Sequence, residues 1–272
     1  MMDKTAQEVL DILKDGYRTS AGRIVDLKKL QKLAIENTKT YTPEECLNIL
    51  NDVKTGKDSK CAIFVTEETT QVATHRLIKE GFTDVVLLNF ASGRNPGGGF
   101  LRGSKAQEED LCRCSGLYNC LAPQTEYYKF NRSNETHLYS DYTIYSPLVP
   151  WFRKRSSEKP DDLFIASVIT SPAPNASRCK TQEEVDEIEK TLIQRAAIIL
   201  AIAQENGHRN LVLGAWGCGI FKNDPELVAD IFGKWLESER FKSAFDHITF
   251  AVYCPGSDKT TFNVFKDRFQ KE

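Results

Sequence analysis

Short apolar runs separated by helical stretches constrain this chain more than any other feature of its sequence. The runs cover residues 61–65, 84–90, 163–168, 211–215 and 247–253. A helical stretch from Thr70 to Lys79 separates the first two, and helical patterns separate the later ones. Short continuous apolar runs suit strands that are buried on both faces. The alternation predicts a mostly parallel α/β sheet covered by helices.

Two of the later helices carry start signals. Thr181, with Glu184 three residues on, predicts a capping box, and apolar residues recur at helical spacing through Ala203. The stretch Asn223-Asp224-Pro225-Glu226 combines an Asx N-cap with a proline in the first turn. We expect both helices to pack on the sheet.

The length of 272 residues is long for one domain and short for two. Residues 1–58 look helical and amphipathic, with breaks at Asp15-Gly16-Tyr17 and Tyr41-Thr42-Pro43 and no low-complexity linker after them. We therefore predict an N-terminal helical extension over 1–58, packed on a core over 59–272. Residues 156–162 are the clearest candidate for an exposed loop.

Composition narrows the classes of function. The sequence has no run of 18 apolar residues, and its N-terminus does not resemble a secretory signal. We expect a soluble protein inside the cell, without membrane contact. A net charge of -2 argues against broad binding of duplex nucleic acid and leaves small anionic ligands open.

The eight cysteines show no framework spacing and no CxxC pattern. Cys112, Cys114 and Cys120 lie close together, but none of the four histidines is nearby. We interpret them as buried thiols and predict neither a metal nor a cofactor.

Two glycine-rich loops follow predicted strands. The first covers residues 91–100 and contains Gly97, Gly98 and Gly99; the second covers 214–225 and ends at a helix N-terminus. Consecutive glycines let backbone N–H groups approach an anion, and a helix dipole adds attraction. Ligands of open α/β sheets bind beyond the carboxyl ends of strands, so the two loops are placed to grip a diphosphate. Glycine turns also arise for steric reasons alone.

Known nucleotide motifs do not fit the first loop. A Walker motif needs Gly-Lys-Ser/Thr, whereas Gly103 is followed by Ser104-Lys105 in the reverse order. A dinucleotide fingerprint would need glycine where Arg102 stands. A kinase or ATPase is therefore disfavoured. In the second loop, Trp216 and Phe221 fit either core packing or stacking on a ligand.

Two adjacent acids, Glu108 and Glu109, are expected in the first turn of a helix that runs to about Ala122. Neighbouring helical residues diverge by about 100°, so the two carboxylates divide the work: one holds sugar hydroxyls and the other moves a proton. The helix dipole alone also favours acids here, and it lowers a carboxyl pKa where a general acid needs it raised. A bound diphosphate and exclusion of water act in the opposite direction.

The stretch Asn89-Phe90-Ala91-Ser92, followed by residues 94–99, a seven-residue spacer and Gln107-Glu108-Glu109, closely resembles the bacterial-type (microbial) poly(ADP-ribose) glycohydrolase family of macrodomain proteins. Tyr145-Ser146-Pro147, the run from Gly214 to Gly219 and Gly16-Tyr17 resemble the same family. The resemblance extends over nearly the whole chain.

This resemblance implies a three-layer α/β/α macrodomain with a mostly parallel mixed sheet, which hydrolyses the ribose–ribose O-glycosidic bond of poly(ADP-ribose) and releases ADP-ribose. It implies Glu109 as the catalytic acid and Glu108 as the residue that orients the ribose. Many macrodomains have asparagine where this chain has Ser92, so Ser92 and Asn95 both stay candidates for the ribose contact. The substrate-binding residues it implies are Ser92, Asn95, Gly97, Gly98, Gly99, Gln107, Gly217, Cys218, Gly219, Ile220 and Phe221.

The expected partners are poly(ADP-ribose), ADP-ribose and ADP-ribosylated proteins, bound by a monomer in the cytoplasm, or in the nucleus of a eukaryotic source. Two other functions fit the same scaffold. One is a non-catalytic ADP-ribose reader, which would need the loops but not both Glu108 and Glu109. The other is hydrolysis of mono-ADP-ribosyl or O-acetyl-ADP-ribose linkages.

Overall fold

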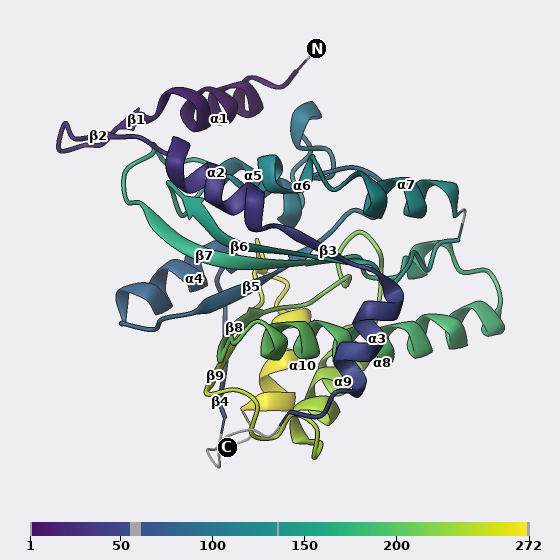
Figure 1. Cartoon of the computed structure of the whole chain (residues 1–272). Coiled ribbons are helices and arrows are strands. Elements are labelled where there is room, and N and C mark those ends of the chain that lie inside the picture. The colour runs from purple at the N-terminus through teal and green to yellow at the C-terminus, as the bar shows by residue number, and fades with distance from the viewer. Residues whose placement is uncertain (1, 55–60, 135, 271–272) are drawn as a thin grey trace.

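The alternating pattern folds into a seven-stranded sheet between two layers of helices (Figure 1). The computed structural model describes residues 2–54, 61–134 and 136–270. The strands are β1 (Tyr17–Arg18), β2 (Ile24–Val25), β3 (Lys39–Tyr41), β4 (Ala62–Thr66), β5 (Val85–Phe90), β6 (Thr143–Trp151), β7 (Phe164–Ser171), β8 (Asn210–Leu213) and β9 (His247–Ala251). The α-helices are α1 (Lys4–Asp15), α2 (Lys28–Asn37), α3 (Pro43–Asn51), α4 (Thr70–Lys79), α5 (Gln107–Cys114), α6 (Leu117–Leu121), α7 (Thr125–Ser133), α8 (Gln182–Glu205), α9 (Pro225–Glu237) and α10 (Thr260–Phe269). Two 3-10 turns, η1 (Phe100–Arg102) and η2 (Ala176–Arg178), complete the described elements.

The sheet is mixed but mostly parallel, as predicted. Its strand order is β3-β6-β7-β5-β8-β9-β4. From β7 to β4 every neighbouring pair is parallel, whereas β6 runs antiparallel to β7 and to β3. The five predicted strands correspond to β4, β5, β7, β8 and β9. Together with the two helical layers, this confirms the predicted three-layer α/β/α class.

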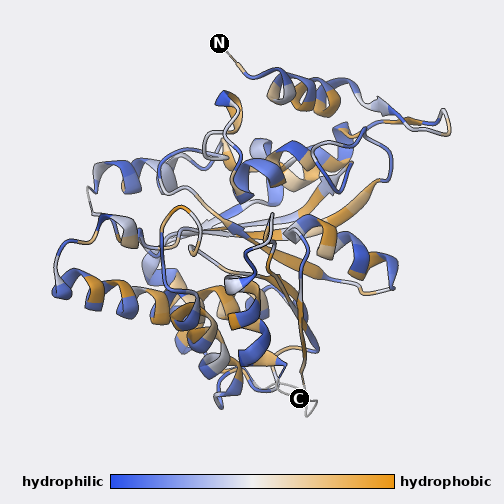
Figure 2. Ribbon diagram, turned by 180° about the vertical axis from the view of Figure 1, so that it is seen from behind, coloured by the Kyte–Doolittle hydropathy of each residue, from blue (hydrophilic) through white to orange (hydrophobic). Residues whose placement is uncertain are grey.

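Each face of the sheet carries its own hydrophobic core, because side chains alternate along a strand. On β5, Val86 and Leu88 belong to one core, and Val85 and Leu87 belong to the other. The first core includes buried residues of α8 and α9, and the second includes those of α1, α5 and α6. Figure 2 shows the apolar strands at the centre, between helices with one apolar face each.

The start signals of the two later helices are confirmed. The Thr181 side chain and Glu184 form the capping box of α8. Asp224 is the N-cap of α9, and its side chain accepts a hydrogen bond from the backbone N–H of Glu226. Local side-chain chemistry therefore sets both helix starts.

The predicted boundary between 1–58 and 59–272 lies outside the described residues and stays a prediction. Helices α1 and α3 end and begin at the predicted breaks. Between them, Lys39–Tyr41 forms an edge strand of the main sheet by pairing with β6. Part of the predicted extension therefore shares the sheet of the predicted core, which the sequence did not indicate.

The prediction of one helix from Glu108 to about Ala122 is wrong. Helix α5 ends at Cys114, and Ser115 is extended and forms an isolated β-bridge with Trp151. The backbone N–H of Gly116 donates to the Pro150 carbonyl. Contacts with the distant strand β6 therefore divide the stretch into α5 and α6.

Among the described residues, no helix is both long and apolar enough to cross a membrane.

Candidate active site

The two glycine-rich loops lie at the same edge of the sheet. They follow β5 and β8, which are neighbouring parallel strands, so their carboxyl ends point the same way. A cleft of about 1170 Å³ opens there. The predicted site residues that line it are Ser92, Asn95, Gly98, Gly99, Gln107, Glu108, Glu109, Gly217, Cys218, Gly219, Ile220 and Phe221. Gly97 is the one predicted residue not in the lining.

Gln107 joins helix α5 to strand β5. Its Oε1 accepts a hydrogen bond from the Phe90 N–H at 2.8 Å, and its Nε2 donates to the Leu88 carbonyl at 2.8 Å. Nε2 also lies 3.1 Å from the Thr70 hydroxyl. Because these bonds engage both ends of the amide, Gln107 serves chiefly to fix the first turn of α5 at the end of β5.

Glu108 is buried beside that junction. One carboxylate oxygen accepts the Ser92 N–H at 2.7 Å, and the other lies 3.2 Å from the Asn89 amide nitrogen. Burial raises the pKa of Glu108 to about 8, although both hydrogen bonds lower it and the nearby Glu109 raises it further. At Glu108, desolvation therefore outweighs the lowering of a carboxyl pKa by a helix N-terminus.

Glu109 makes a different set of contacts. Its Oε1 accepts the Gly99 N–H at 2.7 Å, and its Oε2 accepts the N–H of Ala106, the N-cap residue of α5, at 2.9 Å. The bond to Gly99 links the carboxylate directly to the first glycine loop. The two acids thus occupy unequal environments, which supports the predicted division of work.

The glycines of the first loop allow both carboxylates to approach it. Gly98 has a φ of 58°, and a Cβ there would clash with Glu109 Oε1 and lie 3.0 Å from Glu108 Oε2. Gly97 has a φ of 62°, and its Cβ would meet Cys112 Sγ at 3.1 Å. Gly97 therefore packs toward α5, whereas Gly98 brings the two acids together despite their divergence on the helix.

A hydrogen bond connects Ser92 and Asn95. The Ser92 hydroxyl accepts the Asn95 N–H at 3.2 Å and the Arg94 N–H at 3.2 Å. The Ser92 side chain therefore holds the turn, while both residues line the cleft. This arrangement leaves the Asn95 side chain as the better candidate for a ribose contact.

One buried amide holds the second loop. Asn223 Nδ2 donates to the Pro174 carbonyl at 2.9 Å and to the Gly217 carbonyl at 3.2 Å. Farther along, the loop is open: Ile220 is 74% exposed, and a Cβ on Gly219 would meet nothing within 4 Å. The base of this loop is fixed, and its tip is free to contact a ligand.

The two aromatic residues of the second loop have different fates. Trp216 is fully buried, and its indole N–H donates to the Ser171 carbonyl, so it belongs to the core. Phe221 lines the cleft and packs against Tyr139, with ring centroids 6.0 Å apart. Tyr139 also lies against Gly93, where a Cβ would come within 2.5 Å of its ring. Tyr139 therefore bridges the two loops.

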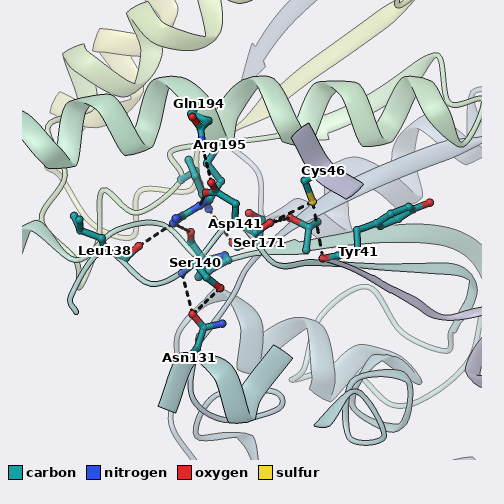
Figure 3. Close-up of polar contacts among 12 residues, drawn as sticks. Tyr41, Cys46, Asn131, Leu138, Ser140, Asp141, Ser171, Gln194 and Arg195 are labelled. Carbon is teal, nitrogen blue, oxygen red and sulfur yellow. Dashed lines mark hydrogen bonds and ion pairs between the residues drawn. The ribbon is translucent and has the colours of Figure 1, made fainter. Parts of the chain in front are cut away.

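Sequence reasoning missed Tyr139 because its position depends on distant residues. It has a φ of 58°, which is unusual for a residue other than glycine. Arg195 on α8 holds the turn from both sides, donating to the Leu138 carbonyl at 3.0 Å and to Asp141 at 2.8 Å (Figure 3). Arg195 is 2% exposed and Asp141 is partly exposed, so the ion pair is partly buried.

Other parts of the cleft lining were also missed. The predicted exposed loop contributes Ser156 and Ser157, Arg155 precedes it, and the N-terminus contributes Asp3 and Thr5. Residues 252–254 follow β9, and the rule that ligands bind beyond parallel strands could have indicated them. No such local signal marks the N-terminal residues.

The clustered thiols Cys112, Cys114 and Cys120 are free and buried, as interpreted. Burial raises the pKa of Cys120 to about 11. Among the described residues, no group of three or more His, Cys, Asp and Glu side chains is arranged to hold a metal ion.

Comparisons with known proteins agree with this geometry. The family model described as microbial-type PARG, catalytic domain, matches residues 6–154. The structure of poly(ADP-ribose) glycohydrolase (PARG) from Thermomonospora curvata is 40% identical, with a TM-score of 0.92 over 97% of this chain and 98% of that one. The Deinococcus radiodurans enzyme in complex with ADP-ribose is 40% identical, with a TM-score of 0.83 over 90% of this chain and 98% of that one. No curated protein matches the chain.

A further Thermomonospora curvata structure contains the inhibitor ADP-HPD and matches with a TM-score of 0.90 at 40% identity, over 97% of this chain and 98% of that one. The family match covers more than half of the sequence, and the structural matches cover nearly all of it. The chain therefore belongs to the microbial-type PARG family.

Proposed function

We propose that this protein is a poly(ADP-ribose) glycohydrolase, which hydrolyses the ribose–ribose O-glycosidic bond and releases ADP-ribose. The observation that carries the proposal is the meeting of Glu108 and Glu109 at Gly98, inside a cleft that both glycine loops line. A reader of ADP-ribose needs the loops but has no use for two buried acids.

In this proposal the diphosphate of the terminal ADP-ribose lies between the glycine loops. The exposed tip at Gly219 and Ile220 closes on it from one side, and Gly98 and Gly99 border it on the other. Glycine at position 219 lets backbone N–H groups approach the phosphates closely, whereas the N–H groups of Gly98 and Gly99 donate to the Asn95 carbonyl and to Glu109. Phe221 lies against the ligand near the distal ribose.

Glu109 carries the proton. It protonates the departing ribose oxygen as an oxocarbenium-like sugar forms, and it then takes a proton from the attacking water. Its hydrogen bonds to Gly99 and Ala106 hold the carboxyl group in one orientation, which favours transfer to a fixed oxygen. The neighbouring diphosphate stabilises the positive sugar, in place of the second carboxylate of ordinary glycosidases.

Glu108 holds the ribose. Its bonds to Ser92 and Asn89 fix it beside Glu109, and burial keeps its pKa raised. A carboxyl group that stays protonated near neutral pH can donate to a sugar oxygen as well as accept from a hydroxyl. It thus orients the distal ribose while Glu109 performs the proton transfers.

The test is Glu109→Gln. Glutamine keeps the size of the side chain and one acceptor oxygen for the Ala106 N–H, so α5 should keep its first turn, while the bond from the Gly99 N–H is lost. Turnover of poly(ADP-ribose) should fall by about 10²- to 10⁴-fold, the usual contribution of a general acid, with polymer binding retained. Release of ADP-ribose and polymer affinity would be measured for wild type, Glu109→Gln and Glu108→Gln.

The substrates distinguish the remaining functions. A wild-type protein that binds ADP-ribose but cleaves nothing would be a reader. A protein that cleaves mono-ADP-ribosylated protein or O-acetyl-ADP-ribose but spares the polymer would contradict the proposal. If Glu109→Gln kept full turnover, the proton transfer would belong to another residue.

ADP-ribosylated proteins as partners, a monomeric state and an intracellular location remain predictions of the sequence. Gel filtration with light scattering measures the oligomeric state directly.

A further inference from the structure

The cleft continues past the two acids. The segment from Arg102 to Lys105 lines it, and Arg155 of the 155–157 loop lines it as well. Ligand sites for drug-sized molecules commonly measure about 300–1,000 Å³, and this cleft reaches about 1170 Å³. It therefore has room for more than the terminal ADP-ribose.

Contacts along the first loop give the direction of this extension. Gly93 lies against Tyr139, which packs on Phe221 of the second loop. Gly98 lies over the two carboxylates, and a Cβ on the next residue, Gly99, would clash with the Ser104 side chain. Residues 102–105 thus lie next to the carboxylates, at the end of the first loop that follows Gly98, whereas the contact with the second loop is made at Gly93.

The extension contains two cations that form no ion pair in the described part of the chain. Arg102 and Lys105 are exposed, and within the described residues neither has a carboxylate at ion-pair distance. Of the acids that line the cleft, Glu67 pairs with Lys259 and Glu68 pairs with Arg76. Among the described residues, Asp3 and Asp110 accept only from neutral N–H groups, and the Asp3 carboxylate lies beside Gly103.

The backbone of this segment is well supported. Arg113 is buried, lines the cleft and donates to the Ser104 carbonyl. The Asp3 N–H donates to the Leu101 carbonyl at 2.9 Å, so the start of the chain holds the other side. The backbone that carries Arg102 and Lys105 is therefore held in place by hydrogen bonds at Leu101 and Ser104.

We infer that Arg102 and Lys105 bind the diphosphate of the second ADP-ribose unit, the one whose ribose oxygen is the leaving group when the terminal unit is released. The inference rests on the proposed glycohydrolase function. In poly(ADP-ribose), the oxygen that Glu109 protonates belongs to a ribose that carries its own diphosphate. A negatively charged group therefore follows the broken bond closely, on the side away from the terminal unit. Arginine and lysine are the side chains suited to bind it.

This subsite also predicts a preference of the enzyme among its possible substrates. The leaving groups of acetylated ADP-ribose and of a mono-ADP-ribosylated side chain carry no diphosphate, so they gain nothing from Arg102 and Lys105. The polymer gains affinity through both cations. The subsite thus favours polymer over these linkages.

The test uses the double variant Arg102→Gln and Lys105→Gln. Its matched control is Lys28→Gln with Lys29→Gln, which removes the same charge from exposed positions on α2. Each protein is assayed on poly(ADP-ribose) and on ADP-ribose with a neutral nitrophenyl leaving group, at low and high salt. The nitrophenyl substrate fills the terminal site but not the extension.

For the double variant, kcat/KM on the polymer should fall about tenfold or more at low salt, mainly through KM, because charge-assisted bonds to phosphate are strong. The nitrophenyl substrate should change by less than about twofold, and the difference should shrink at high salt as charges are screened. The control should match wild type on both substrates.

A double variant that matches wild type on the polymer, or loses activity equally on both substrates, overturns the subsite and leaves the glycohydrolase function intact. A wild-type protein that cleaves neither substrate overturns the proposed function and the subsite together.

Discussion

The two glycine loops lie at the same edge of the sheet but are built in different ways. The first is tightly filled: a Cβ on Gly97, Gly98 or Gly99 would run into a cysteine, a carboxylate or a serine side chain. The second is anchored at Gly217 by Asn223 and is open at Gly219 and Ile220. One half of the site is therefore prebuilt, and the other has room to adapt to a ligand.

This difference assigns different tasks to glycine. In the first loop glycine admits the two carboxylates, so the loop and the acids form one unit. In the second loop, the open tip leaves its backbone free for contact with phosphates. Substitutions in the first loop should change chemistry, and those in the second should change binding.

Gly98→Ala should have the largest effect. The added Cβ would displace the Glu109 carboxylate, and an alanine at a φ of 58° is strained by about 1–2 kcal/mol. We expect kcat on poly(ADP-ribose) to fall by about 10²-fold or more, since small misplacements of a catalytic group cost that much.

The control for backbone strain is Gly22→Ala, with a φ of 80° and no contact within 4 Å of its Cβ. It should lose some stability and keep full activity. Normal turnover in Gly98→Ala would show that the first loop does not position Glu109.

Glu108 should make stability depend on pH. Its pKa is about 8 in the folded protein and 4.5 in its ordinary state, so between these values the folded state keeps a proton that the unfolded state releases. The free energy of unfolding should therefore fall as pH rises from about 4.5 to about 8, relative to Glu108→Gln. Chemical denaturation of both proteins at pH values across this range measures the difference.

The control here is Glu226→Gln, which removes an exposed acid from the first turn of α9. Its free energy of unfolding should change with pH in the same way as that of the wild type across this range. If the free energy of unfolding changed with pH equally in the wild type and in Glu108→Gln, Glu108 would be ionised in the folded protein at all these pH values.

Asn223→Ala should release the base of the second loop. It removes the donor that serves the Pro174 and Gly217 carbonyls, at a cost of about 1–3 kcal/mol in stability. KM should rise more than kcat falls, because the carboxylates stay in place. Asn223→Asp should lower stability more than Asn223→Ala does, since it sets a carboxylate oxygen against two carbonyl oxygens. An aspartate variant as stable as the wild type would contradict the role of Asn223 in holding this loop.

Gly219→Ala should have the smallest effect on the fold. Its Cβ has open space around it, so the free energy of unfolding should change by less than about 0.5 kcal/mol, as at ordinary surface positions. Any functional change should be in KM alone. A large loss of kcat would mean that the second loop positions the reacting groups, against the comparison drawn above.

How far the sequence predicts the site depends on whether a feature is local. The first turn of α5, with Glu108 and Glu109 beside the loop, follows from neighbouring residues and is confirmed. The end of α5 at Cys114 is not predictable in this way, because a bridge from Ser115 to Trp151 causes it. Tyr139 is hidden for the same reason: Arg195, far along the chain, holds its turn.

By itself, the sequence determined the α/β alternation, the two helix caps and the glycine-acid motif, because these depend on periodicity and short-range hydrogen bonds. Tertiary structure alone decided that β3 joins the main sheet, that Gly98 brings the two carboxylates together and that Tyr139 bridges the loops. It also set the raised pKa of Glu108, because the helix dipole is a local effect whereas desolvation depends on everything that packs around the group.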